Sequence, residues 1–507
     1  MTSNEGLYDK NICKRNSKKP IIVHLTPQKP WKTDKMPYVK IWNKYFKKSV
    51  CKNYKLEKVK PFIYKEKILN KRIIHIGKIK ISYHKRIKTD KSINIGIVTT
   101  WFERGAAYVS RQYADVLKEN ANVFIYARGG EEKAVGNSDW DTENVEWDFT
   151  KDFDGYWNTL NLNKFKKWID KNKIDIVLFN EQVWWEPVLY CAKNGIKTVG
   201  YVDYYKKETV EFFDLYDCLI CNTKRHYEVF KNHKNAVYIP WGTDIELFKP
   251  KSCEPVSDCI IFFHSYGYSP NRKGTDFLLR AFERLNGNAR LIIQGQVKVE
   301  DRFPELESLI NKLTTANKLK YIPETTKAPG LFYMGDVYVY PTVLDGIGLT
   351  QAEALASGLP IIVPDCPPMS EFVDKEFSSV VQIDRYEYRQ DNYYWPMCYV
   401  NEDDLVKKMQ FYVDNFEKIK NLKSMARKYA LNNLNWSKNA SSLGEIFHNL
   451  HLIPWEEKMD LELKIQEYDK MNSNKLKLTL PEKIFSIKNQ KTHKVVTMAG
   501  VHIKIRL

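Results

Sequence analysis

Two carboxylates eight positions apart flank a glycine-containing loop in the segment 342–366, TVLDGIGLTQAEALASGLPIIVPDC. Asp345 stands before the loop, and Glu353 lies in the short amphipathic helix that we expect to follow it. Gly346 and Gly348 lack Cβ atoms, so the backbone there can come close to a ligand. The amides at a helix start suit a diphosphate, and Glu353 is placed to accept hydrogen bonds from sugar hydroxyls. The pattern predicts a nucleotide-sugar site, with an ordinary βα turn of a doubly wound sheet as the alternative.

The residues from Glu353 to Pro360 follow the spacing E-A-x-A-x-G-x-P, and the segment resembles the donor site of family 4 glycosyltransferases. These are retaining enzymes with two Rossmann-like domains, the GT-B architecture. The resemblance implies that Glu353 orients a ribose. Asp345, which replaces the family's first glutamate and is one methylene shorter, would contact the donor sugar. Backbone amides would hold the diphosphate along the run Gly346, Ile347, Gly348 and Leu349.

A basic pair precedes a second expected helix in SYGYSPNRKGTDFLLRAFERL. Arg272 and Lys273 resemble the arginine and lysine that bind the donor diphosphate in the family, although here the two residues are adjacent. Arginine supplies a fork of donors and lysine a point charge, which are the usual partners of phosphate oxygens. A solvated basic loop before a helix is the alternative. Gly105, in a loop after the apolar run 93–99, and Gly295, at the end of LIIQG, are two further candidates for donor binding.

Catalysis in the first half of the chain is assigned to Asp203. Family members often place a histidine after the strand that corresponds to KTVGYVDYY, and this chain has Asp203 there. An aspartate there can accept a sugar hydroxyl or act as a general base toward the acceptor. Glu181 and Gln182, which follow the apolar run DIVLF, are rival candidates. A turn or helix-capping aspartate is the structural alternative for Asp203.

Short apolar runs alternate with helical patterns of 10–15 residues in two blocks, 92–245 and 256–430. This alternation predicts the α/β class, with two facing Rossmann-like, doubly wound parallel-sheet domains. Ligands of such sheets lie at the carboxyl ends of the strands, so we expect a cleft between the domains. The expected parts are a basic extension (1–90), an acceptor domain (91–250), a nucleotide-sugar domain (251–432), a crossover helix (433–452) and a C-terminal tail (453–507).

The net charge of +18 is confined to the N-terminal extension. Residues 1–90 carry 25 Lys and Arg against 6 Asp and Glu, whereas the rest of the chain carries 55 against 56. Aromatic residues interleaved with the lysines suit an anionic membrane surface. The same mixture can bind nucleic acid by stacking or form a solvated surface. Because the predicted catalytic core is near neutral, nucleic acid is not the expected partner.

Part of the extension, residues 21–49, resembles the C-terminal end of a family 8 glycosyltransferase. His24, Lys29, Pro30 and Trp31 match an H-x-x-G-x-x-K-P-W element in which the glycine is missing and the spacing is one residue short. The rest of that catalytic domain is not in this chain, so we expect no metal at His24. The segments 65–86 and 481–507 resemble one another, since both run through a glycine-containing turn into alternating β-like residues.

Nine cysteines in scattered apolar contexts indicate buried thiols in a reducing compartment. We see no signal peptide and no apolar run of about 18 residues, the length that a spanning helix needs. The sequence therefore predicts a cytoplasmic protein, peripheral on the inner membrane face. Its expected activity is metal-independent, retaining transfer of a sugar from a nucleotide-diphosphate sugar, the co-substrate, to a surface-glycan or lipid-linked acceptor. No separate cofactor is expected. The alternatives are a DNA-modifying glycosyltransferase and a non-catalytic nucleotide-sugar binder.

Overall fold

The chain is described by a computed structural model over residues 63–68, 71–76, 79–84, 93–128, 134–152, 156–251, 258–476, 485–490, 493–498 and 501–506. It divides into two compact units, Met1–Ile87 and Lys88–Leu507. The family 8-like segment 21–49, including His24, and the lysine–aromatic pattern before residue 63 lie outside the described residues.

The two segments predicted to be related form sheets of the same order and strand length. In the first unit, β1 (Ile63–Ile68), β2 (Lys71–Ile76) and β3 (Ile79–His84) form an antiparallel sheet. Near the C-terminus, β19 (Phe485–Gln490), β20 (His493–Met498) and β21 (Val501–Arg506) pair in the same antiparallel order. Two residues connect each pair of neighbouring strands in both sheets.

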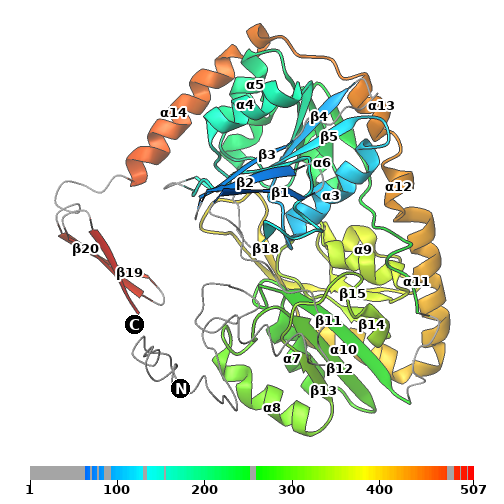
Figure 1. Cartoon of the computed structure of the whole chain (residues 1–507). Helices are drawn as coiled ribbons and strands as arrows, with labels where there is room; N and C mark the ends of the chain where they lie inside the picture. Colours follow the sequence, from blue (N-terminus) through cyan, green and yellow to red (C-terminus); the bar gives the residue numbers. More distant parts are fainter. Residues whose placement is uncertain are drawn as a thin grey trace, which may run out of the picture. The chain divides into compact units, whose positions relative to one another are not determined.

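A seven-stranded parallel sheet forms the centre of the N-lobe, residues 93–251 (Figure 1). The strands are, in spatial order, β10 (Ala236–Tyr238), β9 (Cys218–Cys221), β8 (Lys197–Tyr201), β7 (Ile176–Asn180), β4 (Asn94–Thr99), β5 (Asn122–Ala127) and β6 (Val145–Trp147). The helices between them are α3 (Gly105–Leu117), α4 (Leu162–Asn172), α5 (Glu186–Lys193) and α6 (Lys224–Phe230). All side chains of β7 are buried, as expected for a strand covered by helices on both faces of a parallel sheet. The predicted strands 93–99, 175–179 and 197–201 are therefore confirmed, within a residue at each end.

A six-stranded parallel sheet forms the centre of the C-lobe, residues 258–418. Its strands are, in spatial order, β13 (Leu319–Ile322), β12 (Ala289–Gly295), β11 (Ile260–Gly267), β14 (Val337–Val339), β15 (Ile361–Pro364) and β16 (Ser379–Val381). Its helices are α7 (Thr275–Glu283), α8 (Glu307–Thr315), α9 (Leu349–Ala356) and α10 (Glu402–Asp414). Between β16 and α10 the chain forms an antiparallel hairpin, β17 (Ile383–Glu387) and β18 (Met397–Val400). The prediction of two parallel-sheet α/β domains is confirmed.

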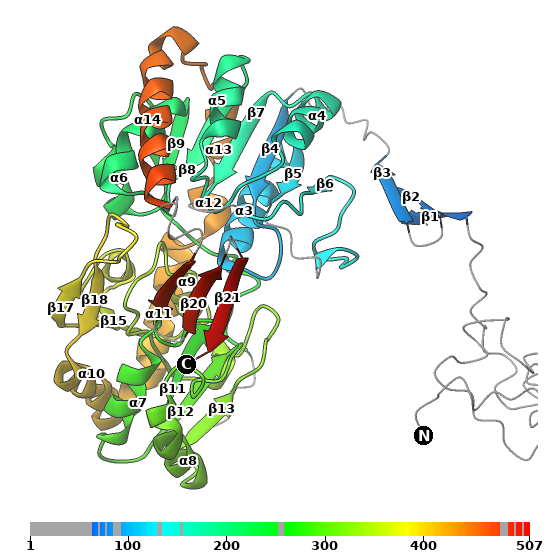
Figure 2. The same ribbon diagram turned by 90° about the vertical axis from the view of Figure 1, so that its left-hand side faces the viewer.

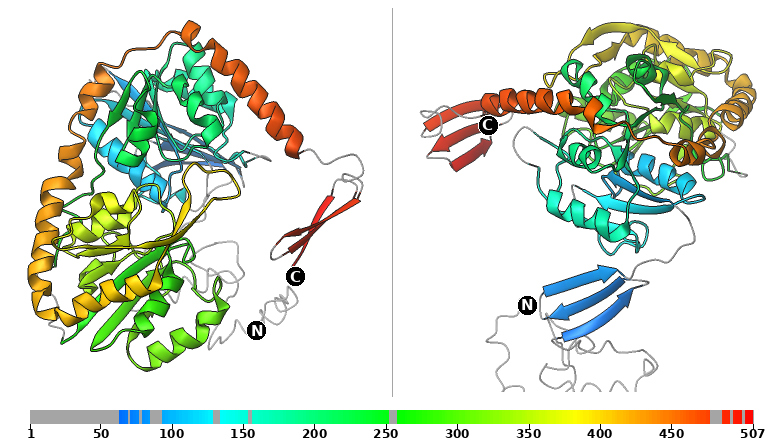
Figure 3. Two further views of the ribbon diagram at one scale, coloured as in Figure 1. Left: turned by 180° about the vertical axis from the view of Figure 1, so that it is seen from behind. Right: turned by 90° about the horizontal axis from the view of Figure 1, so that it is seen from above.

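Helices after the C-lobe return the chain to the N-lobe. α11 (Ile419–Asn433) packs on α9, and α12 (Trp436–Asn439) and α13 (Leu443–His448) follow along the same side of both lobes (Figures 1 and 3). The Trp436 indole donates a hydrogen bond to the Gln112 carbonyl of α3 (3.0 Å) and packs on the Trp241 ring. These contacts fix the return of the chain to the N-lobe.

A last helix, α14 (Met459–Leu476), lies against the N-lobe beside α5 (Figure 2). Ile465 is buried in the N-lobe core, and the Tyr468 ring packs on Phe212. Just before the helix, the Lys458 ammonium and the Asp217 carboxylate form a fully buried ion pair (2.7 Å). The segment expected as a tail thus begins with residues that complete the N-lobe.

Candidate active site between the lobes

Three side chains converge at the carboxyl end of the C-lobe sheet. The Lys273 ammonium, in the loop after β11, donates hydrogen bonds to the Tyr340 hydroxyl and to the Asp345 carboxylate. The Tyr340 hydroxyl donates in turn to Asp345. Tyr340 is fully buried, and the side chains of Lys273 and Asp345 are only 13% and 15% exposed. The structure therefore brings together two residues that the sequence predicts for donor binding.

Burial and mutual attraction set the protonation of this ion pair. Burial, together with the charge of Arg272 and against the opposing effect of Asp345, lowers the pKa of Lys273 to about 8. Burial acts to raise the pKa of Asp345, but the positive charges of Lys273 and Arg272 outweigh it and hold this pKa below its ordinary range. The pair is ionised at neutral pH. Arg272 itself is exposed beside Lys273, within electrostatic range of Asp203 and Glu181 across the cleft.

The loop after Asp345 leads into the start of α9. The Gly346 amide donates to the Asp345 carboxylate (3.0 Å), and Ile347 is buried. Gly348 caps the helix with a φ of +81°, and a Cβ there would lie 2.1 Å from the Gln351 side-chain nitrogen. The first amides of a helix have no partner within it, so this helix start offers hydrogen-bond donors next to Lys273. Leu349, the first helical residue, lies opposite Gly105, where a Cβ would be 3.6 Å from its side chain.

Glu353 stands one turn into α9 with a half-buried carboxylate. Its carboxylate has no hydrogen bond or ion pair with any residue that the structure describes. It lies within electrostatic range of the hydroxyls of Tyr108, on α3, and Tyr338, on β14. Burial raises the pKa of Glu353 to about 7. The group is therefore an unused acceptor, as the sequence predicts for a residue that binds hydroxyls.

Asp203 and Glu181 meet at the carboxyl ends of β8 and β7. Glu181 has a left-handed backbone, φ +52°, which is uncommon for a residue with a Cβ. Its carboxyl group is within electrostatic range of Asp203, whose Oδ1 atom is buried and has no hydrogen-bond partner among the described residues. Burial and the neighbouring Glu181 raise the pKa of Asp203 well above its ordinary value. The two rival candidates therefore lie within electrostatic range of one another and act on the same end of the sheet.

His226, from α6, supplies an imidazole beside this pair that the sequence analysis missed. Its Nε2 lies 3.2 Å from the Gly346 carbonyl and 4.0 Å from the Asp203 carboxylate, and its Nδ1 lies 2.9 Å from the Tyr205 hydroxyl. Burial lowers the pKa of His226 well below its ordinary value. With its proton on Nε2, the neutral ring donates to Gly346 and accepts from Tyr205. The position after β9, far along the chain from Asp203, gave no sequence signal.

Arg128, at the end of β5, is a second residue without a sequence signal. It is 1% exposed and donates one hydrogen bond to the Asn180 carbonyl. Burial lowers its pKa to about 10, and Glu181 opposes the shift. Its Nε and Nη1 atoms have no partner among the described residues. The guanidinium therefore places a positive charge beneath Glu181.

Gly346 is one of the points where the lobes touch. A Cβ on Gly346 would lie 1.9 Å from the Asp203 carboxylate, so only glycine allows this approach. Next to it, the Arg225 guanidinium donates to the carbonyls of Asp345 (2.8 Å) and Pro367 (2.7 Å). The Glu371 carboxylate accepts from the Arg225 amide (2.9 Å). The donor loop thus carries both the Lys273 pair and the contact between lobes.

Gly295 has a structural reason to be glycine, and its predicted part in donor binding stays a prediction. A Cβ at this position would lie 1.9 Å from the Tyr266 ring. That ring is buried, and its hydroxyl donates to the Val297 carbonyl (2.7 Å). The glycine therefore makes room for an aromatic side chain beneath the end of β12. The functional roles of the other predicted residues stay predictions.

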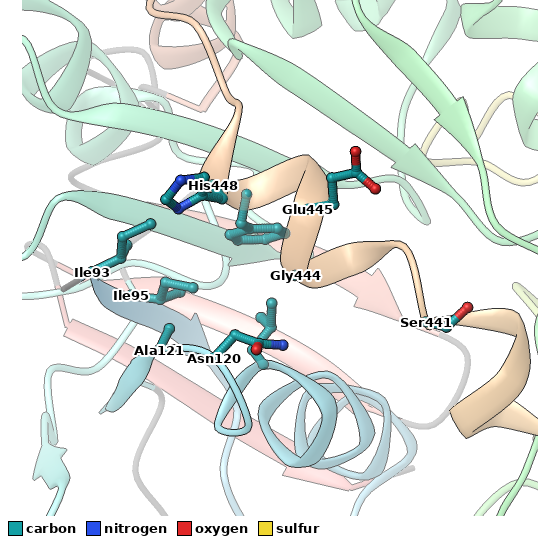
Figure 4. A pocket seen from close by; sticks show the side chains of 10 residues that line it. Ile93, Ile95, Asn120, Ala121, Ser441, Gly444, Glu445 and His448 are labelled. Carbon is teal, nitrogen blue, oxygen red and sulfur yellow. The ribbon is translucent and has the colours of Figure 1, made fainter. Parts of the chain in front are cut away.

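A cavity of about 340 Å³ lies away from this cleft, at the start of β4 (Figure 4). Ile93, Asn120, Gly444 and His448 are among its lining residues. Because ligands of parallel sheets bind at the carboxyl ends of the strands, this cavity is at the wrong edge for a donor.

Among the described residues, no three His, Cys, Asp or Glu side chains are placed to hold a metal ion. None of the helices in that part of the chain is both long and apolar enough to span a membrane.

Comparison with known families places a glycosyltransferase domain in the C-lobe. Residues 258–385 match the family described as "Glycosyl transferases group 1", a range that includes Lys273, Asp345 and Glu353. The uncharacterized glycosyltransferase MJ1059 of Methanocaldococcus jannaschii is 30% identical over 172 residues, 31% of this chain and 41% of that protein. LpsB, a lipopolysaccharide core biosynthesis mannosyltransferase of Rhizobium meliloti, is 33% identical over 69 residues, 14% of this chain and 20% of LpsB. The chain spans less than half the length of these curated relatives.

Similarity to a solved structure covers both lobes. HepE (Alr3699) of Anabaena, in complex with UDP and glucose, superposes with a TM-score of 0.55 at 16% identity. The match covers 71% of this chain and 100% of the HepE chain. The GT-B architecture expected from the sequence is therefore confirmed. Membership of family 4 in particular, and the likeness of residues 21–49 to family 8, stay predictions.

Proposed function

We propose that this protein transfers a sugar from a nucleotide-diphosphate sugar to a hydroxyl group of a surface-glycan or lipid-linked acceptor, with retention of the anomeric configuration. The observation that carries the proposal is the ionised Lys273 bound to Asp345, in the loop that leads into α9, within the matched glycosyltransferase domain. A positive side chain beside unpaired helix amides is a binding site for a diphosphate.

The leaving diphosphate determines the chemistry of the C-lobe. As the bond between the sugar and the diphosphate breaks, negative charge grows on the phosphate oxygens. Lys273, with Arg272 beside it, would stabilise this charge from one side, and the α9 amides from the other. The Lys273 ammonium would exchange part of its contact with Asp345 for the phosphate. Glu353 would accept hydrogen bonds from the ribose, and the freed Asp345 would contact the donor sugar.

The N-lobe would present the acceptor. Asp203 and Glu181 lie within electrostatic range of one another at the strand ends, and Asp203 faces Gly346 of the donor loop, so one of them would accept a proton from an acceptor hydroxyl or hold the transferred sugar. The described residues hold no cluster of metal-binding side chains, and we propose that transfer is metal-independent, without a further cofactor. A relative that acts in lipopolysaccharide core biosynthesis supports a surface glycan as the destination of the sugar.

A donor screen tests the proposal. Thermal-shift measurements with UDP, GDP and their sugar conjugates, in the presence of EDTA, should identify at least one stabilising nucleotide, and release of the nucleoside diphosphate should follow on the hit. Lys273→Ala and Glu353→Ala should each abolish this stabilisation. Lys312→Ala, which removes an exposed lysine of the same lobe that pairs with Glu283, is the matched control. Unchanged turnover in the Lys273 or Glu353 variant would contradict the proposal, as would a screen without any hit.

A further inference from the structure

An aromatic surface borders the acid pair on the N-lobe. The Trp157 ring, in the loop before α4, packs edge-on against the Tyr204 ring with centroids 4.7 Å apart. Tyr204 stacks in turn on Tyr393, at 5.1 Å and an interplanar angle of 17°. Trp157 is 38% exposed. We call Trp157, Tyr204 and Tyr393 the aromatic wall.

The β17–β18 hairpin of the C-lobe completes and fixes this wall. The Tyr393 hydroxyl, between the two strands, donates to the Asp203 carbonyl (3.1 Å). The Tyr204 hydroxyl donates to the Asp391 carboxylate (3.0 Å), and the Tyr394 amide donates to the Tyr205 carbonyl (3.0 Å). The hairpin tip lies beyond residues 258–385, the range that matches the glycosyltransferase family. The wall is therefore formed by both lobes and includes a segment outside the matched domain.

The wall adjoins the carboxyl groups that face the donor. Asn158, next to Trp157 in the chain, donates from its side chain to the Glu181 carbonyl (2.7 Å). Tyr204 follows Asp203 directly, and Glu181 and Asp203 meet in the cleft. An acceptor that rests on the Trp157 ring would thus extend its hydroxyl groups toward the pair.

The chemistry of the wall selects the class of acceptor. Flat aromatic faces bind the apolar C–H face of a pyranose, and carboxylates accept hydrogen bonds from its hydroxyl groups. Glu181 and Asp203 supply such carboxyl groups next to the wall. The nearby Arg389 is already paired with Asp391 at 2.5 Å and lies over the Tyr393 ring. Arg225, another positive group within electrostatic range of Tyr393, already donates to the Asp345 and Pro367 carbonyls, so both arginines near the wall are engaged and neither is set up for a phosphate.

We propose that the aromatic wall is the acceptor subsite and that its ligand is the uncharged pyranose end of a glycan, stacked on Trp157. This inference rests on the proposed transferase function and specifies its acceptor. It makes Trp157 and Tyr204 determinants of acceptor specificity, separate from the residues that hold the diphosphate.

Fluorine NMR on the full chain labelled with 5-fluorotryptophan tests the subsite directly. Trp157→Phe removes one resonance and so assigns it. The labelled protein is titrated with methyl α- and β-pyranosides of glucose, galactose, mannose and N-acetylglucosamine, and separately with a polyprenyl phosphate in detergent micelles. The Trp157 resonance should move with at least one pyranoside. A resonance that moves with no pyranoside, or only with the polyprenyl phosphate, would overturn the inference. Binding of UDP is a separate measurement, so failure of the donor site is distinguished from failure of this one.

Steady-state kinetics with the pyranoside identified by NMR gives a second readout. Trp157→Ala should raise the acceptor KM roughly fivefold, the scale of one aromatic contact, and more than it raises the donor KM. Phe411→Ala is the control, because Phe411 is an aromatic residue of α10 that is 48% exposed. Equal increases in both KM values for the Trp157 variant would contradict a subsite for the acceptor.

Discussion

Replacing Glu353 with glutamine tests whether ionisation of the buried Glu353 carboxylate destabilises the folded protein. Burial raises the pKa of Glu353 from 4.5 to about 7, so the folded protein prefers the neutral acid. An acid whose pKa is raised on folding holds its proton more tightly in the folded state than in the unfolded state. The stability of the protein is therefore greatest below the unfolded pKa and falls as the pH rises to the folded pKa. Above the folded pKa the loss of stability is complete and constant. Glutamine carries no charge at any pH and does not suffer this loss.

The size of the effect follows from the shift. Each pKa unit corresponds to about 1.4 kcal/mol, so the full shift is worth about 3 kcal/mol, and partial exposure of the carboxylate reduces it. We expect the stability of Glu353→Gln, relative to the wild type, to increase by about 2 kcal/mol between about pH 5 and about pH 8.5. Urea unfolding of both proteins at the two pH values measures this difference.

The control for this prediction is Glu305→Gln, which removes an exposed glutamate of the same lobe. A stability difference between Glu353→Gln and the wild type that is the same at both pH values would refute the reasoning. It would mean that the carboxylate is solvated in the folded protein and that burial does not hold it neutral.

Further predictions concern the same cleft and the core beneath it. UDP affinity, measured by isothermal titration calorimetry, should rise with pH up to about 7 in the wild type. Glu353→Gln should lose this pH dependence, because the ribose is proposed to bind the ionised form of Glu353. Gly346→Ala should lower turnover at least ~10-fold and weaken UDP-induced thermal stabilisation, since its Cβ would overlap Asp203 and displace the lobes. Adding Asp203→Ala should relieve the overlap and restore the UDP-induced thermal stabilisation. Lys458→Met should lower the free energy of unfolding, measured with urea, by about 3–5 kcal/mol, because it leaves the buried Asp217 charge without its ion-pair partner. Adding Asp217→Asn to the same chain should recover part of this lost stability.

The elements that the sequence predicted well are those with a local physical cause. Continuous apolar runs such as 93–99 mark strands that are buried on both faces, and they appear as β4 and β7 in the structure. The turn into α9 was also predictable, because Gly348 has a φ of +81°, a conformation that favours glycine. In both cases the residue types express a constraint that acts within a few positions of the chain.

The features that escaped prediction depend on contacts between distant segments. His226 lies 23 positions after Asp203 in the chain, and the pairing of β9 with β8 brings its ring close to the Asp203 carboxyl group. The Tyr393 contact with Asp203 spans 190 positions. The packing at Gly295 escaped prediction for the same reason: the end of a strand is visible in the sequence, but the Tyr266 ring against it is not.

One loop links donor binding to the contact between the lobes. The Asp345 side chain binds Lys273, while its carbonyl accepts from Arg225 of the N-lobe. The next carbonyl, of Gly346, accepts from the neutral His226 ring. A diphosphate that draws Lys273 away from Asp345 therefore changes the loop whose backbone holds the lobes together. A ligand shifts a conformational equilibrium only through its differential contacts with the two states. Under the proposed function, this shared loop would give the donor a physical means to alter the contact between the lobes, including the contact of Gly346 with Asp203.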